Sequence, residues 1–254
     1  MDGSVGFALL LSALAGLSTT IGSLLGIFVR KPGPRFMAVT LGFSAGVMTL
    51  VSFVELLQAG VEAIGFAPAH LAFFGAMVMM LLIDVLVPHD YISEHHSSGG
   101  QPDDERLLRT GLFVALGIGI HNFPEGMASF AGALQEPTLG VAIAVAIALH
   151  NIPEGLAVSV PVYAATGSRR KAFMWSFLSG VAEPIGAALA ALVLVPFLNE
   201  IVLGSALAAV AGIMVFISLD ELVPASSSLG ADHYPIVGAV AGMVLMALSL
   251  WLLR

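Results

Sequence analysis

The chain of 254 residues contains no cysteine, which excludes disulfide bonds and metal sites built on thiolates. Charge is also scarce, because Asp, Glu, Lys and Arg make up 10% of the residues, against about 25% in a soluble domain. With 58% hydrophobic residues, the composition predicts an all-α integral membrane protein and excludes an ordinary water-soluble fold. The net charge of −8 gives no indication of nucleic-acid binding, since most charges lie in loops and inside helices.

Long apolar segments are abundant instead, and about 20 apolar residues are enough to cross a bilayer as a helix. The N-terminus, Met1-Asp2-Gly3, lacks the basic region of a signal peptide, so the first segment is expected to be a retained span. One domain over residues 1–254 is expected, in contact with membrane lipid. We expect eight transmembrane helices, at residues 5–29, 36–58, 69–87, 109–134, 138–163, 171–198, 201–224 and 235–253.

Basic residues predict the orientation of these spans. Only Arg254 lies on one side; the other eight of the nine Lys and Arg residues share the opposite side. Because cytoplasmic loops carry an excess of Lys and Arg, we expect a multi-pass membrane protein with both termini outside. The basic residues on the predicted cytoplasmic side are Arg30, Lys31, Arg35, Arg106, Arg109, Arg169, Arg170 and Lys171.

The long polar loop at residues 88–108 is expected on the cytoplasmic side. It carries His89, His95 and His96 among several acidic residues. Such a composition is typical of a solvated linker. A weak cytoplasmic metal-binding loop is the alternative, and the sequence leaves both interpretations open.

A six-residue motif occurs twice inside the apolar segments, as HNFPEG at residues 121–126 and HNIPEG at residues 150–155. On a helix, His and Glu four positions apart share a face, so His121 pairs with Glu125 and His150 with Glu154. Ionisable groups are costly in a membrane and indicate function. Two imidazoles and two carboxylates form a donor set suited to Zn²⁺, Fe²⁺ or Mn²⁺. A polar network that only holds the two helices together is the alternative.

A third intramembrane carboxylate, Glu183, precedes Pro184 in the segment 171–198. It is a candidate to join the paired motifs, or alternatively to bond to a neighbouring helix. Further acidic residues lie toward the ends of spans, and they mark either a cation pathway or solvated helix ends. These pathway candidates are Glu55, Asp84, Asp220 and Glu221.

An internal repeat relates residues 45–56 to residues 211–222, where six of twelve positions are identical. It joins the second expected span to the seventh, and an odd offset of five spans reverses the direction through the membrane. The repeat is therefore predicted to be inverted, as is the adjacent pair that carries the motifs. Inverted repeats are typical of secondary transporters. The expected architecture is three helices, a central pair, and three helices, a 3+2+3 arrangement.

The doubled His-Asn-x-Pro-Glu-Gly motif resembles the signature of the ZIP (Zrt/Irt-like) metal transporters, and the resemblance extends over essentially the whole chain. It implies a binuclear centre whose two positions share Glu125 and Glu154. It further implies import of zinc, with iron, manganese, cobalt and cadmium, as substrates rather than permanent cofactors, and also a homodimer and sliding of the central bundle. The implied ligands are His121, Glu125, His150 and Glu154 for the first metal, and Asn122, Asn151 and Glu183 with the shared carboxylates for the second.

A metalloenzyme and a channel are the alternatives to a transporter. An intramembrane metalloenzyme is disfavoured, because di-iron bundles use Glu-x-x-His and zinc proteases use His-Glu-x-x-His, whereas this chain has His-x-x-x-Glu. A metal-selective channel stays open, although two layers of intramembrane ligands favour tight binding over fast flow. Imidazole and carboxylate accept several divalent metals alike, so the sequence does not rank them.

Overall fold

The protein is described here by a computed structural model over residues 4–28, 33–86, 104–194, 197 and 199–253. Within these ranges the chain forms helices joined by short connections and contains no strand. In chain order the elements are α1 (Val5–Phe28), α2 (Pro34–Val51), the π-helical turn η1 (Ser52–Leu56), α3 (Leu57–Ile64), α4 (Phe66–Leu86), α5 (Asp104–Gln135), α6 (Pro137–Thr166), α7 (Arg169–Leu194), α8 (Glu200–Ile217), the π-helical turn η4 (Ser218–Leu222), α9 (Val223–Ser228) and α10 (Tyr234–Leu253).

Seven helical segments in the described ranges are long and apolar enough to cross a membrane. The 32-residue helix α5 covers the remaining predicted span. An all-helical membrane protein is therefore confirmed, and two of the helical segments extend well beyond the predicted spans. The span predicted at 36–58 runs from 34 to 64, and the one predicted at 201–224 continues to 228. The first of these ends at Gly65, where a φ of 88° takes the chain out of the helix.

The two π-helical turns account for these long segments, because each joins two α-helices into one rod. They fall at matching positions of the sequence repeat, Ser52–Leu56 and Ser218–Leu222. The first serine of each turn makes the same hydrogen bond: Ser52 Oγ donates to the Met48 carbonyl at 2.7 Å and Ser218 Oγ to the Met214 carbonyl at 2.8 Å. Both serines are buried. The repeat in sequence is thus also a repeat in local geometry.

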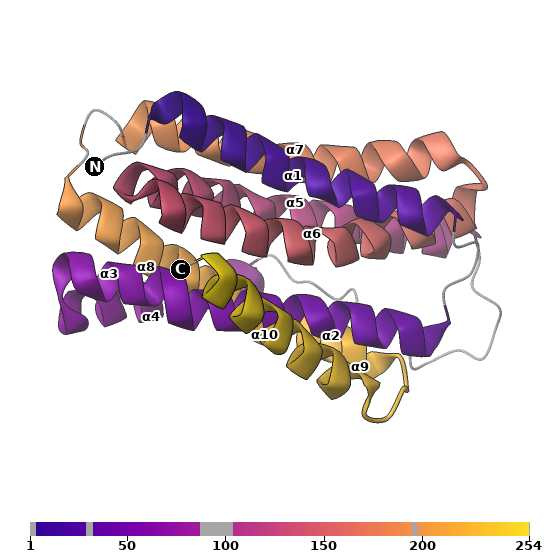
Figure 1. The fold of residues 1–254 in the computed structure, drawn as a ribbon. Coiled ribbons are helices and arrows are strands. Elements are labelled where there is room, and N and C mark those ends of the chain that lie inside the picture. Colours follow the sequence, from indigo (N-terminus) through magenta and orange to yellow (C-terminus); the bar gives the residue numbers. More distant parts are fainter. Residues whose placement is uncertain (1–3, 29–32, 87–103, 195–196, 198, 254) are drawn as a thin grey trace.

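The helices form two groups, which lie in the upper and lower halves of Figure 1. Helices α1, α5, α6 and α7 make one group, in which α1 packs extensively on α6 and α5 on α6 and α7. Helices α2, α3, α4, α8, α9 and α10 make the other, where α2 packs on α10 and α4 on α8. The groups meet mainly through α2 on α6 and α5 on α8.

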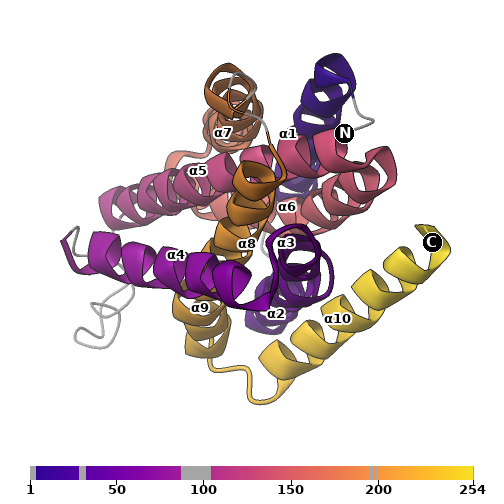
Figure 2. The same ribbon diagram turned by 90° about the vertical axis from the view of Figure 1, so that its left-hand side faces the viewer.

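Among the seven apolar windows in the described ranges, those of α4 and α10 are the least buried, and these two helices flank the bundle on opposite sides in Figure 2. Of the apolar windows at Phe66–Ile83 and Tyr234–Leu252, only 17% and 22% of the residues are buried, against 67% for Pro137–Val160 in α6. A helix with apolar side chains all round and little protein contact suits a lipid environment. Burial is therefore greatest toward the interior of the bundle, at α6 and the residues that it carries.

Candidate metal site

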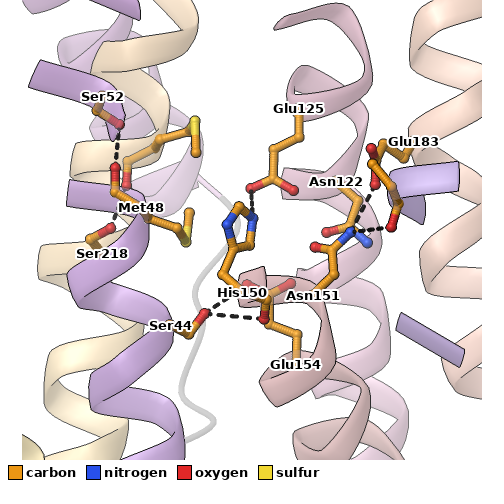
Figure 3. Close-up of polar contacts among 12 residues, drawn as sticks. Ser44, Met48, Ser52, Asn122, Glu125, His150, Asn151, Glu154, Glu183 and Ser218 are labelled. Atoms are coloured by element: carbon orange, nitrogen blue, oxygen red, sulfur yellow. Dashed lines mark hydrogen bonds and ion pairs between the residues drawn. The ribbon is translucent and has the colours of Figure 1, made fainter. Parts of the chain in front are cut away.

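The candidate site lies where α5, α6 and α7 meet (Figure 3). These helices remain continuous through Pro124, Pro153 and Pro184, so the prolines do not interrupt them. Six side chains of types that bind metals, from the three helices, have no exposed surface. Four of them are ionisable, and ionisable groups are rarely buried unless they are paired or bind an ion. The six are Asn122 and Glu125 on α5, His150, Asn151 and Glu154 on α6, and Glu183 on α7.

The two copies of the motif meet at His150 and Glu125. His150 Nε2 lies 3.0 Å from Glu125 Oε1, and both side chains are fully buried. An imidazole of one copy therefore reaches the carboxylate of the other across the α5–α6 contact. This juxtaposition is the one expected if both motifs contribute to one cation site.

The asparagines of the motifs connect the pair to its neighbours. Asn151 Nδ2 donates to Glu183 Oε2 at 2.8 Å, which brings the third carboxylate to the motif of α6. The same amide donates to the Ala15 carbonyl of α1 at 3.1 Å, and Asn122 Nδ2 donates to the Ser179 carbonyl of α7 at 3.1 Å. Glu183 thus contacts the motif of α6, and both amides are oriented by backbone carbonyls.

Glu154 faces the other group of helices. Ser44 Oγ on α2 lies 3.3 Å from Glu154 Oε1 and 3.5 Å from the His150 carbonyl oxygen. Ser44 is not evident from the sequence, because it lies in a run of glycine, alanine and serine that is typical of close helix packing. Its full burial opposite Glu154 is evident only from the structure.

The glycine that ends each motif is required by the approach of a backbone. A Cβ added at Gly126 would lie 1.8 Å from the Glu183 carbonyl oxygen, and one added at Gly155 would lie 1.9 Å from the Thr19 carbonyl oxygen. Real Cβ contacts are never that short, so neither position admits a side chain without displacement of a helix. The motif therefore sets the packing of α7 and α1 as well as the donors.

Several buried oxygens of the site have no hydrogen-bond partner among the described residues: Glu125 Oε2, Glu183 Oε1, Asn122 Oδ1 and Asn151 Oδ1. Buried acceptors without a partner are uncommon and need an explanation such as a bound ion or water. Carboxylate and amide oxygens together with the imidazole of His150 are ligands for divalent cations of intermediate hardness. The cluster thus brings together donor types that divalent cations bind.

Other predicted residues do not extend this cluster. Among the described side chains, no group of three or more His, Asp or Glu residues is arranged to hold a metal ion. His121, the fourth donor implied for the first metal, lies on α5, but its side chain is outside the described part of the structure, as is that of Asp84 on α4. His89, His95 and His96 also fall outside it.

The remaining pathway candidates lie on the π-helical turns. Glu55 belongs to η1 and Asp220 and Glu221 belong to η4. Glu55 and Glu221 are half-buried and occupy matching positions of the repeat, while Asp220 is exposed. The two turns thus present acidic groups outside the central cluster, on the rods that α2 and α8 begin.

Comparison with known proteins shows the family. The family model described as "ZIP Zinc transporter" matches residues 85–250. A protein of Streptococcus mutans named "Zinc transporter ZupT" is 49% identical over 96% of this chain and 97% of its own length. Proteins with the same name from Nitratidesulfovibrio vulgaris, at 49% identity over 99% and 98% of the two chains, and from Chlorobium phaeovibrioides, at 54% over 97% of each, are similarly alike. The chain belongs to the ZIP zinc transporter family.

Proposed function

We propose that this protein is a transporter, not an enzyme, that takes up zinc and other divalent cations into the cytoplasm. The observation that carries the proposal is the group of six fully buried ligand-type side chains where α5, α6 and α7 meet. The similarity of the chain, over nearly its full length, to proteins named zinc transporters supports zinc as a substrate. Iron, manganese, cobalt and cadmium are included because the same donor types bind them.

The cations are held in a binuclear intramembrane site. The first metal takes His121, Glu125, His150 and Glu154, and the second takes Asn122, Asn151 and Glu183 while sharing Glu125 and Glu154. The Glu125–His150 distance of 3.0 Å supports the first set, and the Asn151–Glu183 distance of 2.8 Å supports the second. Two positions that share carboxylates lower the repulsion between the cations, because each bridging carboxylate faces both of them.

The architecture is eight spans, including α5, in a 3+2+3 arrangement of inverted repeats. The pattern of helix packing supports it. In such a repeat the first three spans correspond in order to the last three, and α5 corresponds to α6. The α2–α10 contact then corresponds to the α8–α4 contact, and the α1–α6 contact to the α7–α5 contact. All four contacts are extensive, and the π-helical turns correspond in the same way. Such repeats place a site at their interface near the membrane midplane.

The path through the membrane runs between the two π-helical turns. The positive-inside rule places both termini outside, so Glu55 on η1 lies toward the outer side and Asp220 and Glu221 on η4 lie toward the cytoplasm. Asp84 and the loop histidines His89, His95 and His96 belong to the cytoplasmic end. Acidic groups at both ends attract hydrated cations before the ligands of the central site strip their water.

Transport proceeds by sliding of the group formed by α1, α5, α6 and α7 against the remaining helices. The limited contact between the groups, chiefly α2 on α6 and α5 on α8, supports this motion. The hydrogen bond from Ser44 to Glu154 spans that boundary and would break or re-form as the site moves. The protein forms a homodimer in the bacterial inner membrane, as the family resemblance implies, and the dimer holds the group of α2, α3, α4, α8, α9 and α10 in place.

Uptake by purified protein in liposomes tests this function. Zn²⁺, Fe²⁺, Mn²⁺, Co²⁺ and Cd²⁺ are offered separately, with and without a proton gradient, and accumulation is compared with that in protein-free vesicles. Saturation at micromolar concentration with slow turnover supports a carrier. Conduction that does not saturate and far exceeds carrier rates would indicate a metal-selective channel, and no accumulation of any metal would refute the proposal.

A further inference from the structure

Helices α1 and α7 carry a second repeat in this chain, beyond the repeat at residues 45–56 and 211–222. Residues 12–22 align with residues 176–186, and five of the eleven positions are identical. The two helices pack against each other at Gly16 and Gly180, where a Cβ added to either glycine would lie 2.5 Å from the carbonyl oxygen of the other. The contact between α1 and α7 is therefore symmetric at its centre.

The hydrogen bonds around this contact obey the same correspondence. Ser12 Oγ on α1 donates to the Glu183 carbonyl at 3.3 Å, and Ser176 Oγ on α7 donates to the Thr19 carbonyl at 3.3 Å. The asparagines follow it as well, since the Asn151 amide donates to the carbonyl of Ala15 and the Asn122 amide to that of the matching Ser179, both at 3.1 Å.

Thr19 on α1 consequently occupies the place that Glu183 occupies on α7. Two distances agree with this match. The Thr19 Cβ would lie 3.1 Å from a Cβ added to Gly180, and the Glu183 Cβ would lie 3.2 Å from a Cβ added to Gly16. Glu183 reaches Asn151 from this place. By the same correspondence, Thr19 is to Asn122 of α5 what Glu183 is to Asn151 of α6.

The Thr19 hydroxyl is buried, and Thr19 Oγ1 has no hydrogen-bond partner among the described residues. A threonine inside a helix usually donates to the carbonyl four residues before it, as Thr49 does to Ala45. For Thr19 that carbonyl belongs to Ala15, which already accepts from Ser18 Oγ at 2.6 Å and from Asn151 Nδ2 at 3.1 Å. The usual partner of the hydroxyl is thus taken by the network that orients Asn151.

Asn122 shows the matching feature on α5. Its amide nitrogen donates to Ser179, so its Oδ1 faces away from that carbonyl, and Oδ1 has no partner among the described residues. Thr19 Oγ1 and Asn122 Oδ1 are therefore two neutral buried oxygens on the α1 side of the site. On the α7 side the equivalent pair is Asn151 with the carboxylate of Glu183.

We propose that the Thr19 hydroxyl is an oxygen ligand of the second cation, directly or through one water, opposite Glu183. This inference rests on the proposed function. The second cation would then have ligands of unequal charge on its two sides, an anionic oxygen from α7 and a neutral oxygen from α1. A single terminal carboxylate holds the second cation less strongly than two would, which favours its release. Thr19 thereby adjusts affinity at the second position without changing the first.

The test is Zn²⁺ binding to purified, detergent-solubilised protein, measured by calorimetry for the number of ions and for each affinity. Thr19→Val keeps the shape of the side chain and removes the oxygen, so the second ion should bind about tenfold more weakly, the scale of loss when a supporting group of a metal site is removed. The first affinity should not change. Thr19→Ser keeps the hydroxyl and should bind as the wild type does.

Thr20→Val is the matched control, because Thr20 already donates to the Leu17 carbonyl and should have no effect. Thr19→Glu should act in the opposite direction and tighten the second affinity, since the glycine at Gly180 leaves the space that Gly16 leaves for Glu183. Elution as one folded species is required of each variant. If Thr19→Val binds both ions as the wild type does, the inference is wrong. If the wild type binds no ion, or Glu154→Gln leaves both affinities unchanged, the proposed function itself fails.

Discussion

His150 Nε2 and Glu125 Oε1 lie 3.0 Å apart, although 25 positions separate the two residues in the chain. The imidazole comes from one copy of the repeated motif and the carboxylate from the other, and neither is exposed. The contact places the two motifs side by side in the protein interior. It also means that a change in one motif alters the surroundings of the other, which makes the site testable by single substitutions.

Single cysteines at Ser4 and at Ser98 should react with an impermeant thiol reagent from opposite sides of the membrane. The native chain has no cysteine, so each variant reports one position only. The expected result follows from the distribution of Lys and Arg, which places residues 88–108 in the cytoplasm and the N-terminus outside. Labelling of both from the same side would refute the eight-span topology.

Gly126→Ala should severely destabilise the protein, because its Cβ would lie 1.8 Å from the Glu183 carbonyl oxygen. The helices α5 and α7 must separate to admit the methyl group, which disturbs both packing and site. Thermal unfolding monitored by size exclusion should show a lower transition temperature or little folded material. Gly75→Ala is the control, since nothing lies within 4 Å of a Cβ added there. Equal transition temperatures for the two variants would contradict the structure.

Glu183→Ala should change metal preference rather than abolish transport. Glu183 is the one carboxylate of the cluster outside the paired motifs, and it contacts the Asn151 amide at 2.8 Å. Its loss removes charge from the second position and leaves the first set of ligands intact. Competition between Zn²⁺ and Cd²⁺, Mn²⁺ or Fe²⁺ for uptake measures the preference. An unchanged preference profile at equal abundance would reduce Glu183 to a contact between helices.

Metal affinity should fall as the pH is lowered from about 7.5 to about 5.5, since free imidazole titrates at about pH 6.5. His121 and His150 bind a cation only in the neutral form, and the carboxylates only when ionised, so protons compete with metal. Calorimetric binding at several pH values checks this, with His121→Ala combined with His150→Ala as the comparison. A flat wild-type profile, or an equally steep one in the double variant, would show that other groups bind the competing protons.

Much of the fold followed from the length of apolar segments, because a bilayer demands spans of nearly fixed length. The helical segments that carry the second and seventh spans run several residues past the predicted bounds, since hydropathy does not register a π-helical turn such as Ser52–Leu56 that lets a helix continue. The turn has no distinctive composition. The structure shows that the turn is a repeated feature, because an equivalent turn lies at the matching position Ser218–Leu222.

The predicted ligands could be named from sequence because the His and Glu of each motif share one helix face. Neutral partners on other helices could not. Ser44 and Thr19 are ordinary small polar residues in runs typical of close packing, and only the tertiary arrangement brings Ser44 to Glu154. The alignment of residues 12–22 with 176–186 pairs Thr19 with Glu183, but a hydroxyl in place of a carboxylate gives no sign of a ligand until the packing of α1 on α7 is known.

Zn²⁺ uptake by Glu154→Gln in liposomes tests the central claim most directly, which is that transported cations pass through the buried site of α5, α6 and α7. The substitution keeps the size of the side chain and removes the charge that both metal positions share. Glu136→Gln is the control, because Glu136 is an exposed residue just before α6, outside the site. The account predicts uptake at the level of empty vesicles for Glu154→Gln and wild-type uptake for Glu136→Gln, at equal amounts of folded protein. Wild-type uptake by Glu154→Gln would contradict it.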